Sequence, residues 1–311
     1  MQLFVQALQH VTLGDDAERL FHGRGGMFAG CEHLCLDWFP PVLLLTSFKA
    51  VDEDEINVLT TAITQRWLQL KGQDPLNLVF QHRCGGQTET QLLQGAVPEP
   101  HYVTENGAQF QVHLLRGQNH GLFLDMRAGR AWVKQHAKQC KVLNLFAYTC
   151  GFSVMALQGG ADEVVNIDMS KGALSIGKQN HLHNGLAHGA RFLGHDIFKS
   201  WGKLTKFGPY DLIIADPPSN QRGSFVATKD YARLLRRLPS LLAEQGDILL
   251  CLNAPELDID FLMQQVAEHS PDLIFIEQLA NPEVYCDKDP NKALKVLRYQ
   301  HKRDMDSTVT V

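Results

Sequence analysis

The sequence predicts an α/β protein built from a mostly parallel sheet of about seven strands, preceded by a small α+β domain. Two observations predict this division. From Val142 onward, short apolar runs alternate with segments of helical periodicity, which favours a parallel sheet with helices on both faces. Before residue 100, three strand-like runs flank one long helical pattern instead.

The composition is that of an ordinary globular protein. Hydrophobic residues make up 44% of the 311 positions and charged residues 20%, and no apolar run reaches the roughly 20 residues of a membrane span. The N-terminus lacks the pattern of a secretory signal, and the seven cysteines are too scattered for a disulfide framework. We therefore expect a cytoplasmic protein that does not attach to membranes. The net charge of -5 argues against coating nucleic acid by charge alone but allows a local basic groove.

Residues 1–100 are expected to form the small α+β domain, a candidate for substrate recognition. Asp52 and Asp54 offer an N-cap and first-turn charge to a helix over 55–70, in which apolar residues recur at intervals of three and four. Strands are expected at 33–37, 42–48 and 77–82.

Residues 101–126 are expected to form a β-hairpin connector, with paired strands between Tyr102 and Asp125. Asn106-Gly107 is a strong turn signal between alternating runs. The remaining residues, 127–311, are expected to form the large domain. Its later helices include one over 229–244, which Pro239 should kink or split.

One stretch of the large domain predicts a nucleoside-cofactor site. A strand from Val142 leads into a turn over 146–151 and a helix, and the next strand ends at Asp168. A turn that opens a helix directs unpaired N–H groups at a ligand, and an acid at the next strand tip can accept hydrogen bonds from ribose hydroxyls. The turn is not G-x-G-x-x-G, which favours a ligand without phosphates, such as S-adenosylmethionine, over a dinucleotide. An ordinary βα turn, with Asp168 as a helix cap, is the alternative.

Two further strand tips carry acids. Asp196, followed by Ile197, could hold an adenine, or could be a solvated carboxylate. Asp216-Pro217-Pro218-Ser219 follows the apolar strand 210–215, and its two prolines remove N–H donors and stiffen the turn. Backbone carbonyls there could hold an amine or a ring nitrogen that is about to be methylated, although such a turn can also be purely structural.

Taken together, these motifs resemble the bacterial 23S rRNA methyltransferase family, whose members modify pyrimidine carbon-5 or a guanine ring nitrogen. The segments that carry the resemblance are VLNLFAYTCGFSV, VVNIDMSKGAL, NHLHNG, DLIIADPPS and GQNHGLFLDMR. The resemblance runs from about Tyr102 to the C-terminus and extends more weakly to the N-terminal α+β unit. The small RNA-binding domain that precedes this unit in some members is expected to be absent. It implies a Rossmann-like class I methyltransferase fold with one antiparallel strand, S-adenosyl-L-methionine as cofactor, 23S rRNA or a ribosomal precursor as partner, and no metal.

The resemblance also implies roles for individual residues. The methionine end of the cofactor would be held by Asn144, Phe146, Ala147, Tyr148, Thr149 and Gly151. The ribose would be held by Asp168 with Met169 and Ser170, and the adenine by Asp196 and Ile197. Leu124, Asp125 and Arg127 would close over the cofactor, and the catalytic segment would be Asp216, Pro217, Pro218 and Ser219.

Two departures from the family pattern matter. Cys150 stands where the family commonly has Gly, which costs about 1 kcal/mol if the backbone there has positive φ. The carbon-5 branch uses a cysteine nucleophile at the position of Ala254, while Cys251 lies earlier, inside the expected strand. Direct transfer to a nitrogen, which needs no nucleophile, is therefore favoured. Cys251 keeps the carbon-5 reaction open.

The remaining charged residues are less specific. Arg233 and Arg237 share a helix face and could contact RNA phosphates, although a solvated face is the simpler explanation. Four histidines, 181, 183, 188 and 195, are interpreted as surface or RNA-facing rather than as metal ligands. Two other functions stay open: a methyltransferase that acts on a small molecule or a protein, and a non-catalytic RNA-binding or ribosome-assembly factor.

Overall fold

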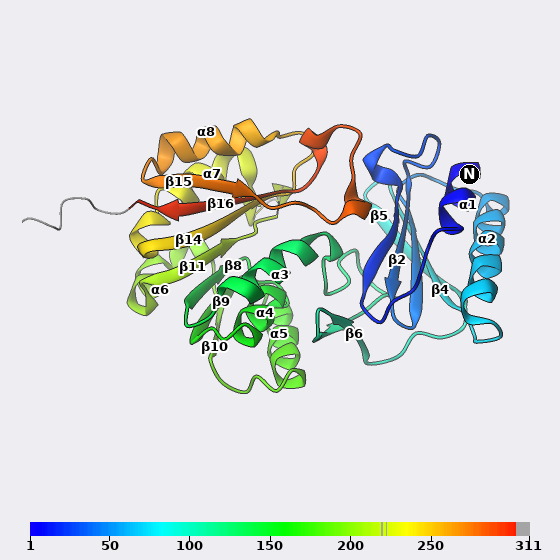
Figure 1. Ribbon diagram of the computed structural model, residues 1–311, viewed down its shortest axis with the longest axis horizontal. Coiled ribbons are helices and arrows are strands. Elements are labelled where there is room, and N and C mark those ends of the chain that lie inside the picture. The colour runs from blue at the N-terminus through cyan, green and yellow to red at the C-terminus, as the bar shows by residue number, and fades with distance from the viewer. Residues whose placement is uncertain (219, 222, 303–311) are drawn as a thin grey trace, which may run out of the picture. The chain divides into compact units, whose positions relative to one another are not determined.

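The computed structural model describes residues 1–218, 220–221 and 223–302, and the chain separates into two compact units (Figure 1). Unit 1 comprises Met1–Arg127 and Asn281–Ala293, and unit 2 comprises Ala128–Ala280 and Leu294–Val311. This grouping differs from the expected division in two ways. The hairpin expected as a separate connector belongs to unit 1, and a segment near the C-terminus returns to the same unit.

Backbone hydrogen bonds between distant segments explain both differences. The Ala17 N–H donates to Thr104 O at 2.7 Å, and the Asn106 N–H donates to Asp16 Oδ2 at 3.0 Å, which fastens the hairpin to the N-terminal segment. The Lys288 N–H donates to Gly25 O at 2.7 Å, which fastens the returning segment. These bonds join residues far apart in the chain, so no local sequence pattern announces them.

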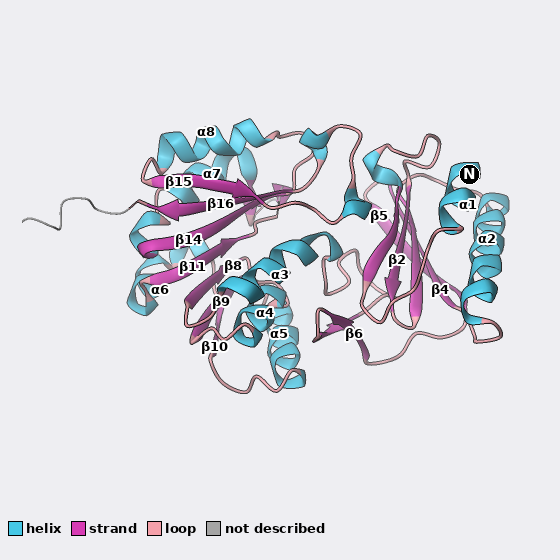
Figure 2. Ribbon diagram, viewed as in Figure 1, coloured by secondary structure: helices cyan, strands magenta, loops and turns pink. Residues whose placement is uncertain are grey.

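Unit 1 is a five-stranded sheet with two helices on one side (Figure 2). Neighbouring strands are antiparallel except β3 and β4, which are parallel, and the strand order is β1-β2-β3-β4-β5. The expected strands and long helix are confirmed, whereas β1, β5 and α1 were not anticipated. The elements are α1 (Gln2–Leu8), β1 (Glu18–His22), β2 (Leu34–Phe39), β3 (Val42–Ser47), α2 (Glu53–Lys71), β4 (Asn77–Cys84) and β5 (Gln87–Gln94).

Helix α2 begins and packs as its sequence predicts. Asp52 is the N-cap, and its Oδ1 accepts the Glu55 N–H at 2.8 Å. Leu59, Ile63 and Trp67 are buried against the apolar face of the sheet. The opposite face of the sheet is different, because alternate residues of β1 and β2 there are charged or polar.

The hairpin is confirmed only in its first half. Strands β6 (His101–Glu105) and β7 (Ala108–Val112) pair around Asn106-Gly107, both of which have positive φ. The following residues do not form the expected second pair of strands. The His113 N–H donates to His120 O at 3.0 Å and closes a loop, and Leu124–Met126 form a 3-10 helix. Glycines at 117 and 121 with positive φ bend this loop away from an extended conformation.

Unit 2 contains the predicted seven-stranded sheet, in the order β10-β9-β8-β11-β14-β16-β15. Strand β16 runs antiparallel to both of its neighbours and the other pairs are parallel, so the expectation of one antiparallel strand is confirmed. The strands are β8 (Lys141–Leu145), β9 (Glu163–Asp168), β10 (Ala190–Gly194), β11 (Tyr210–Ala215), β14 (Leu242–Leu252), β15 (Leu273–Gln278) and β16 (Lys295–His301).

Helices cover both faces of this sheet (Figure 1). Leu204 of α6 packs in one apolar core with buried residues of α7 and α8, including Tyr231 and Leu262. Side chains of α4 and α5 contact the opposite face. The helices are α3 (Arg127–His136), α4 (Gly151–Gln158), α5 (Lys171–His183), α6 (Trp201–Phe207), α7 (Ala227–Leu235) and α8 (Ile259–His269).

The helix expected over 229–244 is wrong at its C-terminal end. Helix α7 ends at Leu235, Pro239–Leu241 form a 3-10 turn, and Leu242 already begins β14. Leu242 pairs with Tyr210 of β11, so a tertiary strand contact overrides the local helical pattern. No helix among the described residues is long and apolar enough to cross a membrane.

Candidate functional site

The turn between β8 and α4 has an unusual backbone. Phe146, Tyr148 and Cys150 have φ angles of 55°, 46° and 61°, although none of them is glycine. Left-handed conformations of this kind cost about 1–2 kcal/mol per L-residue and gather at functional sites, where the surrounding fold holds them. Cys150 adopts the positive φ that suits glycine, so the expected cost of a non-glycine residue at this position applies.

Neighbouring elements hold this turn in place. The Ala147 N–H donates to Ile167 O at 3.1 Å, and the Asn180 side chain of α5 donates to Thr149 O at 3.0 Å. The Cys150 sulfur is buried against Gly177, where a Cβ would lie only 2.5 Å from it. Helix α5 can therefore approach the turn this closely because residue 177 has no side chain.

Asp168, at the carboxyl end of β9, joins the turn to the next helix. Its Oδ2 accepts the Tyr148 N–H at 2.8 Å and its Oδ1 accepts the Ser170 N–H at 2.7 Å. Ser170 is the N-cap of α5, and its Oγ accepts the Ala173 N–H. Met169 is half exposed. The Asp168 carboxylate is only half-buried, and because each oxygen accepts one N–H, lone pairs remain for ribose hydroxyls.

A buried chain of neutral hydrogen bonds lies between the sheet and helices α4 and α5; we call it the neutral network. The Asn144 Nδ2 donates to Asn166 Oδ1 at 2.9 Å, and the Asn166 Nδ2 donates to Ser153 Oγ at 2.9 Å. Ser153 lies 2.8 Å from His181 Nε2, and His181 Nδ1 lies 2.7 Å from Gly177 O. Because a carbonyl accepts, Nδ1 carries the proton, so Nε2 accepts the Ser153 hydroxyl.

This network corrects one expectation and bears on another. His181 is buried, not on the surface, and burial lowers its pKa. His181 lies two residues from an exposed histidine, and its local sequence does not indicate burial. Its burial depends on the network that includes Ser153 and Asn166, which lie far from it in the chain. Asn144 is also buried, so its side chain supports the strand beneath the turn, and its role toward the methionine end stays a prediction.

The next strand tip, after β10, carries the second acid. The Asp196 Oδ1 accepts the Phe198 N–H at 2.9 Å, so Asp196 caps a 3-10 helix over Ile197–Lys199, and Ile197 is buried. Phe198 belongs to an aromatic group that the sequence did not single out. Phe225 packs edge-on against Phe146 at a centroid distance of 5.3 Å and lies 6.4 Å from Phe198.

The predicted catalytic segment follows β11 directly. Asp216 and Pro218 are half-buried and Pro217 is buried, while Ser219 lies outside the described residues. A short hairpin, β12 (Asn220–Gln221) and β13 (Phe225–Val226), comes next and was not anticipated. Burial raises the pKa of Tyr231, and electrostatic interactions with Cys251 and Asp216 raise it further.

The end of β14 carries the residues that bear on the two chemistries considered above. Cys251 is fully buried in the strand, and its carbonyl accepts the Tyr231 hydroxyl. Ala254 is also buried, and its carbonyl accepts the Lys295 ammonium at 3.2 Å. Lys295 also donates to Leu257 O at 2.6 Å, so a buried cation fixes this loop. A substrate ring cannot reach the Cys251 sulfur in this arrangement.

Three predicted cofactor residues belong to the loop at the end of unit 1. Leu124 is buried, and Asp125 is half-buried. The Arg127 guanidinium donates to Asp16 Oδ2 at 2.7 Å and to Ala17 O at 3.4 Å. Arg127 is thus paired within its own unit.

The basic residues after the catalytic segment differ from each other. The Arg233 guanidinium is 2.7 Å from Asp230 Oδ1 and lies over the Phe198 ring, 4.2 Å from its centroid. Arg237 is exposed but lies beyond the end of α7, so the shared helix face expected for the two arginines is wrong.

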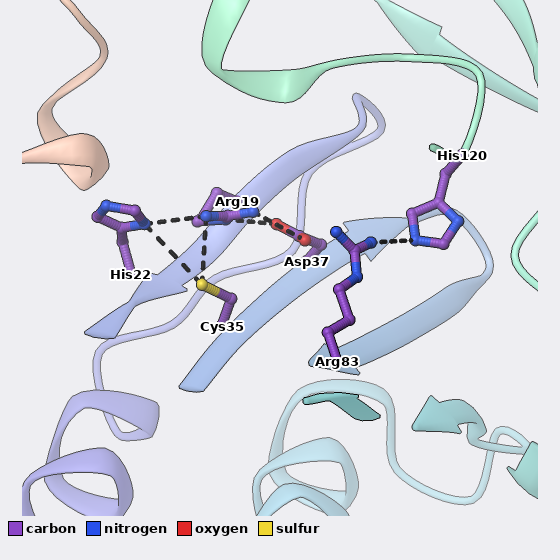
Figure 3. Close-up of polar contacts among 6 residues, drawn as sticks. All are labelled: Arg19, His22, Cys35, Asp37, Arg83 and His120. Atoms are coloured by element: carbon purple, nitrogen blue, oxygen red, sulfur yellow. Dashed lines mark hydrogen bonds and ion pairs between the residues drawn. The ribbon is translucent and has the colours of Figure 1, made fainter. Parts of the chain in front are cut away.

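Unit 1 holds a second polar cluster, which we call the charged cluster (Figure 3). The Arg19 Nε donates to Asp37 Oδ1 at 2.6 Å and its Nη2 donates to Asp37 Oδ2 at 3.1 Å. Its Nη1 lies 2.9 Å from His22 Nδ1 and donates to Cys35 Sγ at 3.3 Å. The Arg19 guanidinium also lies over the Tyr285 ring, 5.0 Å from the centroid.

Burial and neighbouring charges set the protonation of this cluster. Burial and then Arg19 lower the pKa of His22 to about 4, which keeps the ring neutral at pH 7. Sequence reasoning missed the whole cluster, because its members lie on separate strands and in the returning segment.

Comparison with known proteins agrees with this arrangement. Residues 18–300 match the family model described as S-adenosylmethionine-dependent methyltransferase. The Ribosomal RNA large subunit methyltransferase I of Tolumonas auensis is 30% identical over 281 residues, covering 85% of this chain and 70% of the relative. The protein of the same name from Aeromonas salmonicida is 29% identical over 242 residues, and the match spans only 61% of its length.

A solved structure of a protein complexed with SAH shares the fold, with a TM-score of 0.81 and 24% identity. The match covers 96% of this chain and 81% of that chain. The predicted fold class is thereby confirmed. Because the family model matches most of the chain, the chain belongs to the S-adenosylmethionine-dependent methyltransferase family.

Proposed function

We propose that this protein methylates a base of large-subunit (23S) rRNA in the cytoplasm, by direct transfer from S-adenosylmethionine to a nitrogen. The family match supports the cofactor, and the relatives named as large-subunit rRNA methyltransferases support the substrate. The burial of Cys251 and Ala254 supports a nitrogen rather than carbon-5 as the acceptor, because carbon-5 chemistry needs an accessible nucleophile.

The residues at the carboxyl ends of β8, β9 and β10 fit the cofactor. The observation that carries this assignment is Asp168, whose half-buried carboxylate is oriented by the Tyr148 and Ser170 N–H groups. Asp168 would accept the ribose hydroxyls, the turn over 146–151 would hold the methionine end, and Asp196 with Ile197 would hold the adenine. The bound cofactor would supply a methyl group on a positively charged sulfur.

The catalytic segment would position the acceptor base. With two prolines in place of N–H donors, the Asp216 carboxylate and the carbonyls of this segment can accept hydrogen bonds from the N–H groups of a base. Such bonds aim the lone pair of the acceptor nitrogen at the methyl carbon, and orientation of this kind is the main source of catalysis when no covalent intermediate forms. Unit 1 would contribute substrate recognition, and Leu124, Asp125 and Arg127 remain predicted cofactor-binding residues.

The decisive test combines Asp216→Asn with a matched control. We expect methyl transfer from labelled S-adenosylmethionine to rRNA from a deletion strain to fall about 10²- to 10⁴-fold, as for loss of a positioned catalytic group. Calorimetry should show nearly unchanged cofactor affinity. Asp260→Asn, an exposed residue of α8, should behave like the wild type. Wild-type protein that binds no cofactor at millimolar concentration would overturn the proposal.

Two further variants test the parts of the site. Asp168→Ala should weaken cofactor binding, because it removes both the ribose acceptor and the bond that holds Tyr148; unchanged affinity would refute that role. Cys251→Ala should retain methyl transfer. If it abolished transfer while cofactor binding persisted, the covalent carbon-5 reaction would be the correct one.

A further inference from the structure

Three side chains of unit 1 meet at one end of its sheet. The strand register explains why: His22 pairs with Cys35, Leu34 pairs with Ser47, and Ser47 pairs with His82. These ends of β1, β3 and β4 therefore lie at the same end of the sheet. Arg24, Phe48 and Arg83 sit at or just beyond these ends.

The two arginines flank the phenylalanine ring. The Arg24 Cζ is 4.1 Å from the Phe48 ring centroid, and the Arg83 Cζ is 5.7 Å from it. Arg24 is exposed and Phe48 is half-buried. A guanidinium held over an aromatic face keeps its N–H donors pointing sideways, where they can reach a ligand as a planar fork.

Neither arginine forms an ion pair within the described part of the chain. Arg19 is neutralised by Asp37, but no carboxylate lies within ion-pair distance of Arg24 or Arg83 among the described residues. Neutral groups hold Arg83 instead: its Nη2 donates to Gln118 O at 2.6 Å and lies 3.0 Å from His120 Nε2. Two fixed positive charges beside each other, in a chain of net charge -5, form a local anion-binding feature.

We propose that Arg24, Phe48 and Arg83 bind a single-stranded segment of RNA. The exposed Arg24 guanidinium, supported by the Phe48 ring, contacts a phosphate with its N–H edge and carries a stacked base on its plane, and Arg83 adds a positive charge beside it. Guanidinium forks suit phosphate oxygens, and single-stranded bases stack on aromatic rings and guanidinium planes. The inference deepens the proposed function, since the strand would be a part of the rRNA substrate, and it gives unit 1 a specific role in holding that substrate.

The test measures binding of a fluorescent twelve-nucleotide oligouridine to the full chain between 50 and 200 mM salt. Arg24→Ala should raise the Kd about tenfold and reduce the slope of log K against log salt by about 0.7, the loss expected for one phosphate contact on a single strand. Phe48→Ala should raise the Kd about five- to tenfold without changing the slope, because stacking carries no charge. Lys71→Ala, an exposed cation at the end of α2, is the matched control and should bind like the wild type.

Two readouts keep the outcomes separate. Thermal unfolding and cofactor affinity should be unchanged in Arg24→Ala, and Arg24→Lys should bind with intermediate affinity because it keeps the charge but loses the fork. If the wild type methylates rRNA while Arg24→Ala and Phe48→Ala bind RNA as Lys71→Ala does, the site is refuted and the proposed function stands. If the wild type neither methylates nor binds RNA, the proposed function fails and the site fails with it.

Discussion

The two units each contain a buried polar network, and the two networks are built on opposite principles. In unit 1, the charged cluster centres on a two-point ion pair between Arg19 and Asp37, surrounded by histidine, cysteine and tyrosine. In unit 2, the neutral network passes hydrogen bonds in one direction from Asn144 to the Gly177 carbonyl, without a charged group. Each network lies on one face of the sheet of its own unit, but the loss of one member should have a different effect in each.

The difference lies in what each removal leaves behind. An amide that loses its partner inside a protein costs the desolvation of one polar group, whereas a buried guanidinium that loses its carboxylate leaves an uncompensated charge. Location differs as well. The neutral network supports the strand and helix that flank the cofactor turn, so damage to it should reach the predicted site, while damage to the charged cluster should remain in unit 1.

The largest effect is expected for Asp37→Ala. It leaves the Arg19 guanidinium, which is largely buried, without a carboxylate, and should destabilise unit 1 by about 3–5 kcal/mol. Glu163→Ala is the matched control, because it removes partly exposed ion pairs with Arg191 and Lys141 and should cost less than about 1 kcal/mol. Thermal unfolding reports both changes, together with hydrogen exchange of β2 amides for Asp37→Ala and of β9 amides for Glu163→Ala. Equal costs would show that the Arg19–Asp37 pair is as dispensable as a surface pair.

The sequence anticipated unit 2 far better than this cluster, for a physical reason. The turn over 146–151, Asp168 and Asp216 follow local rules, since each stands where a buried strand ends and the residues that define the pattern are neighbours in the chain. Arg19 and Asp37 are 18 residues apart, and their pairing depends on the register of β1 on β2. Tyr285 joins them only through the returning segment 281–293, which has no local signal.

Tertiary contacts also explain the local errors. Leu242 pairs with Tyr210 and so begins a strand where helical periodicity continued. His181 is interior because Ser153 and the Gly177 carbonyl satisfy the two nitrogens of its ring, and the match with Ser153 is visible only in three dimensions. Cys150 is the reverse case: its departure from glycine was visible in the sequence, but the compensating absence of a side chain at Gly177 was not.

The next largest effect is expected for Asn166→Leu. It leaves Asn144 Nδ2 without its acceptor and Ser153 Oγ without its donor, which should cost about 2–3 kcal/mol of stability and weaken cofactor binding. The double variant Asn144→Leu/Asn166→Leu should recover part of the loss, because it removes both ends of one hydrogen bond. Denaturant unfolding and calorimetry measure the two quantities. If the loss of stability in the double variant equals the sum of the losses in the two single variants, the side chains do not act as a network.

Close packing should give a somewhat smaller effect at Gly177→Ala. The new Cβ would lie 2.5 Å from Cys150 Sγ, so the turn or α5 must shift, at a cost of about 1–3 kcal/mol. Cys150→Gly/Gly177→Ala should restore most of the stability, because glycine removes the clash and relieves the positive φ of residue 150. Thermal unfolding of the two variants provides the comparison. A double variant no more stable than Gly177→Ala would place the clash elsewhere.

A smaller effect should appear as pH dependence in unit 1. His120 packs beside Arg83, Phe39 and the His113 carbonyl. Burial, the largest cause, lowers its pKa to about 4; the hydrogen bond to the His113 carbonyl and the charge of Asp37 oppose the lowering, and Arg83 adds to it. The unfolded chain takes up this proton near pH 6.5 and the folded one only near pH 4, so stability falls as pH falls between these values. Between pH 6.5 and 5.5 the loss should be about 1 kcal/mol.

His120→Gln provides the check, because glutamine has no titrating group. Its stability should depend less steeply on pH between 6.5 and 4 than that of the wild type, and the remaining slope should come in part from His22, whose pKa is also about 4. Denaturant unfolding at a series of pH values measures the slopes. Identical slopes in the two proteins would show that His120 titrates normally in the folded state.

The smallest effect is expected where the charged cluster already tolerates an unsatisfied group. The Tyr285 hydroxyl is buried and finds no hydrogen-bond partner among the described residues, so Tyr285→Phe should leave the unfolding temperature unchanged or slightly raised. The matched variant in unit 2 is Tyr231→Phe, which removes a hydroxyl that donates to Cys251 O and should cost about 1–2 kcal/mol. Equal losses in thermal unfolding would mean that the Tyr285 hydroxyl makes a hydrogen bond of its own.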